Sequence, residues 1–93
     1  MPKEKEKKDD GKVYIGAKPL INYIQAITFQ LERQPEVIVA SRGKFTARAL
    51  DVVEIAKHKY NVVVKEIKTD SEDFEVEGKQ LRVTTIEIRV IKK

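Results

Sequence analysis

The sequence predicts one α+β domain, a two-layer sandwich in which two helices cover one face of a four-stranded mixed sheet that extends into a β-hairpin arm. Two observations predict this fold class. The length of 93 residues fits a single domain. Along the chain, short apolar runs of strand length alternate with longer segments in which apolar residues recur about every 3.6 positions. Together these segments give the order β-α-β-α-β-β.

Residues 1–11, the segment MPKEKEKKDDG, contain no apolar residue after Met1. Such a segment buries too little apolar surface to offset the entropy lost on ordering, so we expect a disordered, charged tail followed by a folded domain over residues 12–93. The lysines of the tail are nearly balanced by its acidic residues. A solvated tail is therefore the plainer interpretation, and an arm that grips phosphate is the alternative.

The first strand is expected at residues 12–15, followed by a short loop that leads into a helix. Pro19 suits the first turn of that helix. The helical period then continues to about Gln34, and Pro35 ends the helix because the residue before a proline is pushed out of the α region. The apolar residues of this helix are Leu20, Tyr23, Ile24, Ile27 and Leu31.

The continuous apolar run at residues 37–40 predicts a second strand that is covered on both faces. Residues 41–44 then form a turn into a second helix, and Asn61 is a suitable stop signal at its end. The apolar side of this helix is expected to carry Phe45, Ala49, Val52, Val53, Ala56 and Tyr60.

The third strand begins at Val62 and continues through Ile67, and residues 70–79 are expected to form a hairpin arm with its tip at residues 77–79. In the last strand, the alternation of apolar residues changes phase across Thr84 and Thr85. A change of phase predicts a β-bulge at that point, because one extra residue reverses the facing of every residue after it. The two phases are Leu81 and Val83, then Ile86, Ile88 and Val90.

The sequence offers little material for catalysis. His58, the only histidine, lies near the end of the second expected helix, where the helix dipole favours a positive charge. No second histidine and no cysteine is present to complete a metal site. The acidic residues between Asp70 and Glu77 lack the glycine and the spacing of a calcium loop. We therefore expect neither an enzyme nor a bound metal or cofactor.

No apolar run approaches the length of a membrane span, and the N-terminus lacks the apolar segment of a secretory signal. A soluble cytoplasmic protein with no membrane partner is the expectation. The formal net charge of +4 and the isoelectric point near 9.3 point weakly to a polyanionic partner.

Basic residues gather at the two loops that enter the helices. Lys18 lies in the first loop, Arg42 and Lys44 flank Gly43 in the second, and Arg48 follows one turn later. If the first two strands are parallel, both loops emerge at the same edge of the sheet, beside two helix N-termini. The pattern favours one phosphate-binding patch, although ordinary solvated cations are the plain alternative.

Three segments carry a resemblance to the Alba (Sac10b) family of archaeal chromatin proteins. The segment VYIGAKPLINY ends the first strand, SRGK and ALDVVEI surround the second loop, and TTIEI lies in the last strand. The likeness covers about residues 12–93. It implies homodimers that coat DNA or RNA at the chromosome with little sequence preference, through phosphate contacts at the two loops and a hairpin directed at the minor groove. It also marks Lys18 as a candidate for acetylation.

The chain departs from the family pattern in ways that imply weaker binding. Ala17 stands where the family usually has a second lysine, and the arm carries five acids against Lys79 and Arg82. Tyr60 replaces a phenylalanine that the family often uses between dimers. The expected nucleic-acid-binding residues are Lys18, Arg42, Gly43, Lys44, Arg48, Lys79 and Arg82.

The acidic arm and the missing lysine also favour an alternative. In it, the chain is a diverged member of the family that binds nucleic acid weakly or not at all. It would act as a protein-interaction module, for example in a heterodimer with another Alba-like subunit.

Overall fold

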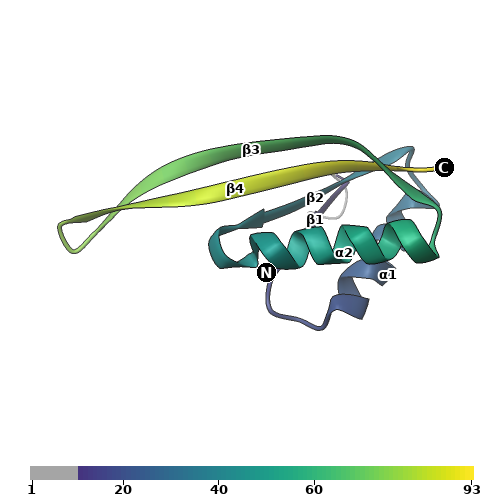
Figure 1. Ribbon diagram of the computed structural model, residues 1–93, viewed down its shortest axis with the longest axis horizontal. Helices are drawn as coiled ribbons and strands as arrows, with labels where there is room; N and C mark the ends of the chain where they lie inside the picture. The colour runs from purple at the N-terminus through teal and green to yellow at the C-terminus, as the bar shows by residue number, and fades with distance from the viewer. Residues whose placement is uncertain (1–10) are drawn as a thin grey trace.

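The computed structural model describes residues 11–93, so the expected tail lies outside the described residues except for Gly11. The order β-α-β-α-β-β is confirmed, with one short 3₁₀ helix added before the second α-helix (Figure 1). The elements are β1 (Lys12–Tyr14), α1 (Leu20–Leu31), β2 (Glu36–Arg42), η2 (Gly43–Phe45), α2 (Thr46–Lys59), β3 (Val62–Val76) and β4 (Lys79–Lys92).

The sheet is mixed, as expected, and its strand order is β1-β2-β4-β3. β1 and β2 are parallel, whereas β4 pairs antiparallel with both β2 and β3. Both helices lie on the same side of the sheet (Figure 1). The side chains that fill the space between the two layers are fully buried, and the largest of them are Ile27, Val37, Val39, Val52, Ile88 and Val90.

The first helix ends three residues earlier than expected. Residues 32–34 carry no apolar side chain for the core, and they form a turn in which the amides of Arg33 and Gln34 both donate to the carbonyl oxygen of Gln30. The second helix buries four of the six apolar residues assigned to it. Phe45 is only half-buried ahead of the helix, and the expectation for Tyr60 is wrong, because Tyr60 follows the helix end and is 43% exposed.

The second strand is longer than the apolar run that predicted it. Ser41 and Arg42 were expected in a turn, but they pair with Ile86 and Thr85 of β4. The long neighbouring strand supplies hydrogen-bonding partners beyond the apolar run, so the strand continues. The remaining part of the expected turn forms η2.

The hairpin arm is formed by the far halves of β3 and β4, which pair continuously to Val76 and Lys79. Glu77 and Gly78 make the turn with φ values of +52° and +79°, a conformation that favours glycine at the second position. The expected tip is therefore confirmed. The arm extends beyond the body of the molecule, from the end at which β2 leads into α2 (Figure 1).

The expected bulge at Thr84 and Thr85 is wrong. These residues pair in unbroken register with Ser71 and Asp70, and the irregularity lies instead in β3, between Val64 and Glu66. The apolar residues change phase because the strand leaves the helices behind. Near the body they face the helices and are buried, whereas along the arm they lie on the opposite face of the sheet, where Leu81 is 47% exposed.

Among residues 11–93, no helix has both the length and the apolar character needed to cross a membrane.

Candidate nucleic-acid interface

The two basic loops lie at the same edge of the sheet because β1 and β2 run parallel, as expected. β1 ends at Tyr14 and is followed by the segment that we call the Lys18 loop (residues 15–19), and β2 ends at Arg42, directly before η2. The amide of Ile15 donates to the carbonyl oxygen of Ala40 at 2.9 Å, which continues the pairing into the Lys18 loop. Local sheet geometry therefore sets the two loops beside each other.

Arg48 of α2 ties the Lys18 loop to the second helix. Its Nε–H donates to the carbonyl oxygen of Gly16 at 2.9 Å, and a second guanidinium nitrogen donates to the carbonyl oxygen of Lys18. A planar guanidinium can hold two carbonyl oxygens at once, which an ammonium group does less well. The side chain that the sequence predicts to contact phosphate therefore hydrogen-bonds to the backbone of the neighbouring loop.

Tyr23 of α1 holds the same loop from the other side. Its hydroxyl oxygen accepts hydrogen bonds from the amides of Gly16 at 2.9 Å and Lys18 at 3.0 Å. These bonds reduce the number of backbone amides that could bind an anion at the start of α1. The Lys18 amide is already hydrogen-bonded, and Pro19 has no N–H. Sequence analysis placed Tyr23 in the core but missed its hydroxyl, since apolar periodicity carries no information about a polar tip.

The second loop presents Lys44 beside a constrained glycine. Gly43 has a φ of +57°, a backbone conformation that L-amino acids with side chains rarely adopt. A Cβ at this position would meet only the side chain of Val83, at an ordinary 3.6 Å, so the backbone conformation and not crowding favours glycine here. Lys44 is exposed, with its ammonium nitrogen 5.5 Å from the centre of the Phe45 ring.

Arg42 points along the open face of the sheet, away from the helices, and meets the arm. Its guanidinium forms an ion pair with Glu72 and lies 5.3 Å from the centre of the Phe74 ring. The arginine side chain is 59% exposed, so water and salt screen the pair. An arginine that was predicted to contact phosphate thus forms an ion pair with a carboxylate of the same chain.

The two basic residues predicted on the arm have different surroundings. Lys79 begins β4, next to the tip, and is exposed. Arg82 donates from Nε to a carboxylate oxygen of Asp73 at 3.0 Å, across the hairpin. The arm and the body therefore share one arrangement, in which an arginine expected to bind phosphate lies against an acidic residue of β3.

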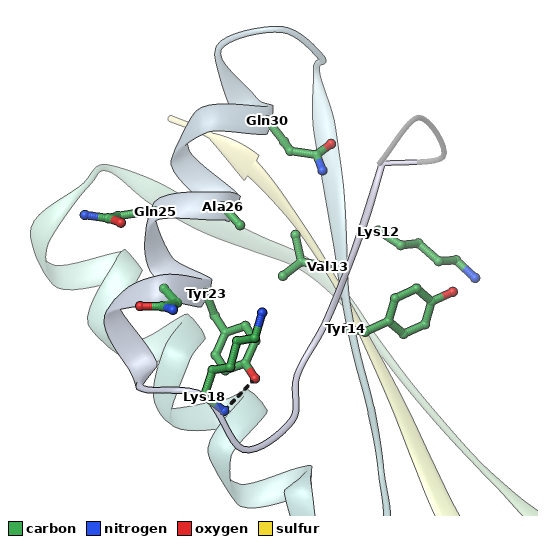
Figure 2. Close-up of a pocket in the computed structure, with 9 residues that line it drawn as sticks. Lys12, Val13, Tyr14, Lys18, Tyr23, Gln25, Ala26 and Gln30 are labelled. Carbon is green, nitrogen blue, oxygen red and sulfur yellow. Dashed lines mark hydrogen bonds between the residues drawn. The ribbon is translucent and has the colours of Figure 1, made fainter. Parts of the chain in front are cut away.

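A groove beside the Lys18 loop separates β1 from α1 (Figure 2). Its volume is about 550 Å³, and the side chain of Lys18 runs along it next to the Tyr23 ring. A second hollow of about 510 Å³ shares Tyr14, Lys18 and Tyr23 with the groove. Within residues 11–93, no group of three or more histidine, cysteine, aspartate or glutamate side chains is placed to hold a metal ion.

The fold and this edge define a class of protein: a small α+β sandwich that presents two cationic loops and a long β-arm from one end. Known proteins share this fold. The Alba family model matches residues 11–71 of the chain. The chain belongs to the Alba family.

Relatives and solved structures agree with that assignment. A DNA/RNA-binding protein Alba from Methanococcus maripaludis is 40% identical over 89% of this chain and 99% of its own length, and one from Nanoarchaeum equitans is 39% identical over 87% and 97%. The structure of Alba from Thermoplasma volcanium has a TM-score of 0.76 at 32% identity, covering 87% of this chain and 99% of that one. ALBA1 from Trypanosoma brucei has the same TM-score at 31% identity, covering 88% and 68%.

Proposed function

We propose that this protein binds DNA or structured RNA through the phosphate backbone, with little sequence preference, as a non-enzymatic, chromatin-type protein associated with the nucleoid. The observation that carries the proposal is the cationic edge at which the Lys18 loop and η2 lie side by side. The relatives named DNA/RNA-binding protein Alba support the same function.

The roles that we assign follow from the placement of each side chain. Lys18 and Lys44 are exposed cations at the two loop ends and supply phosphate contacts. Gly43 lets the backbone of the second loop approach a phosphate. Arg42 contributes when its guanidinium exchanges the Glu72 carboxylate for a phosphate, and Arg48 holds the Lys18 loop in place.

The arm contributes the outer contacts in this proposal. Lys79, next to the tip, and Arg82, on the same strand, position the arm against the duplex, and the acids of β3 oppose them. Each added carboxylate repels phosphate, and each paired arginine must first lose its partner. Affinity is therefore expected to be lower than a chain of the same fold with a basic arm would have.

We also propose a homodimer as the binding unit. Three exposed apolar residues offer surface that a partner subunit would cover: Leu50 on α2, Tyr60 directly after α2, and Ile67 on β3. Lys18 is the proposed acetylation site, because removing its charge would delete a phosphate contact at the Lys18 loop.

A salt titration of binding to matched DNA and RNA duplexes tests this function. If a dimer neutralises roughly six phosphates, the logarithm of the association constant should fall with the logarithm of the salt concentration at a slope near −5. The double variant Lys18→Glu, Arg42→Glu should bind much more weakly. A flat salt response, or unchanged affinity of the double variant, would overturn the proposal.

A second candidate function is protein interaction without strong nucleic-acid binding, for example with another Alba-like subunit. The pairing of Arg42 and Arg82 with arm carboxylates favours it, as do the exposed apolar residues Phe74, Val76 and Leu81 on the same arm. No gel shift at tens of micromolar protein in low salt would favour this candidate over the first.

A further inference from the structure

The groove between β1 and α1 has the size of a ligand site and a distinctive lining. Its volume of about 550 Å³ falls within the range of roughly 300–1,000 Å³ that is common for small-ligand pockets. Val13 lines it from the β1 wall, and Ala26 and Gln30 line it from the α1 wall (Figure 2). Among residues 11–93, none of the side chains that line it is acidic.

The β1 wall of the groove offers backbone groups as well. The carbonyl oxygen of Gly11 and the amide of Ile15 both pair with β2, at Ile38 and Ala40. Because alternate residues of a parallel strand face its partner, the amide and carbonyl of Tyr14 point outward, toward the free edge. Among residues 11–93, β1 is the edge strand of the sheet, and it forms one wall of the groove.

Tyr23 adds a further polar group to the lining of the groove. The residue is only 8% exposed, and its hydroxyl oxygen already accepts two backbone amides. No residue in 11–93 accepts the hydroxyl proton in return. Tyr23 lines both hollows next to Lys18, and a hydroxyl that accepts two hydrogen bonds can still donate one. The hydroxyl is therefore a donor that is already in place for an oxygen in the groove.

We propose that this groove binds one nucleotide whose base lies outside the duplex. Its phosphate would contact the Lys18 ammonium and the Tyr23 hydroxyl, and its base would lie against Val13 and Ala26, with its edge toward the amide of Gln30. Unpaired bases expose hydrogen-bonding edges that amide side chains and free backbone groups recognise. The inference rests on the proposed function, since the groove adjoins the cationic edge that is proposed to bind phosphate.

The chemistry of the lining favours a nucleotide over an extended peptide. A cation at the mouth and an amide on the wall suit a phosphate joined to a base. The position of the groove also favours a nucleotide, because Lys18 lines the groove and its loop forms part of the cationic edge. A nucleotide flipped from a duplex held at that edge would reach the groove without leaving the protein.

Binding of matched duplexes with and without one unpaired nucleotide tests the inference, in RNA and in DNA. The wild-type chain should prefer the bulged duplex about fivefold to tenfold, because a net hydrogen bond to the edge of the base is commonly worth about that much. Ala26→Leu should fill the groove and Gln30→Ala should remove its amide, and each should abolish the preference while leaving binding to the perfect duplex within about twofold. Thr28→Ala, a truncation on α1 at a residue that does not line the groove, should keep the preference.

The possible outcomes separate the two proposals. Equal affinity of the wild-type chain for bulged and perfect duplexes overturns the nucleotide site and leaves the proposed function intact. Binding to neither duplex overturns the proposed function and the nucleotide site with it. A preference seen with both RNA and DNA assigns recognition to the base and phosphate, whereas a preference with RNA alone adds the 2′-hydroxyl. Thermal melting of each variant identifies any loss of fold.

Discussion

Arg48 donates its Nε–H to the carbonyl oxygen of Gly16, 2.9 Å away and 32 positions earlier in the chain. The same guanidinium reaches the carbonyl oxygen of Lys18. Together with the Tyr23 hydroxyl, which receives the amides of both residues, it holds the Lys18 loop on two sides. The loop that carries the exposed lysine is thus set by side chains from both helices before any ligand arrives.

Arg48→Lys should weaken binding about threefold to tenfold without changing the salt slope. A lysine keeps the positive charge but cannot hold two carbonyl oxygens in the fixed geometry of a guanidinium, so the loop loses its orientation while the number of charges stays constant. Duplex binding over a range of salt concentrations measures both quantities. Arg33→Lys, in the turn that follows α1 and away from the Lys18 loop, is the matched control and should bind like the wild type. A slope that became shallower in Arg48→Lys would instead indicate a direct phosphate contact.

Tyr23→Phe should destabilise the fold by about 1–3 kcal/mol, because two partly buried amides lose their acceptor. Urea denaturation measures the free energy of unfolding, and hydrogen exchange at the Gly16 and Lys18 amides reports the lost bonds directly. Tyr60→Phe removes an exposed hydroxyl and should change stability by no more than about 0.5 kcal/mol. Unchanged exchange at both amides in Tyr23→Phe would show that the hydroxyl does not hold the loop.

Sequence patterns predict the fold of this chain better than they predict its site. Apolar periodicity predicts the strands and helices because burial in the core is what the period records. It misplaces the bulge, because the phase change at Thr84 and Thr85 reflects a strand leaving the helices, which produces the same pattern as an inserted residue. The pairing of Arg42 with Glu72, 30 positions apart, depends on the register of three strands. No local pattern contains that register.

Glu72→Gln should strengthen nucleic-acid binding and make the salt slope steeper. Removing the carboxylate frees the Arg42 guanidinium for phosphate, and each added phosphate contact steepens the slope by about 0.9. Because the pair is exposed, the free energy of unfolding should change by less than about 1 kcal/mol. Glu75→Gln removes an equal charge from the same strand without freeing Arg42, so it should raise affinity less and leave the slope nearly unchanged. Equal effects of the two variants would show that the arm acts only through its total charge.

Lys18→Gln, which removes the charge as acetylation would, should lower affinity and make the salt slope shallower by about 0.9 for each protomer in contact with the duplex. The backbone bonds of the loop do not involve the ammonium group, so the melting temperature and the exchange of the Gly16 and Lys18 amides should stay as in the wild type. Lys65→Gln, at the register shift in β3 and outside the cationic edge, provides the control for net charge. If both substitutions reduced the slope equally, binding would depend on net charge alone, and the Lys18 loop would have no special part in it.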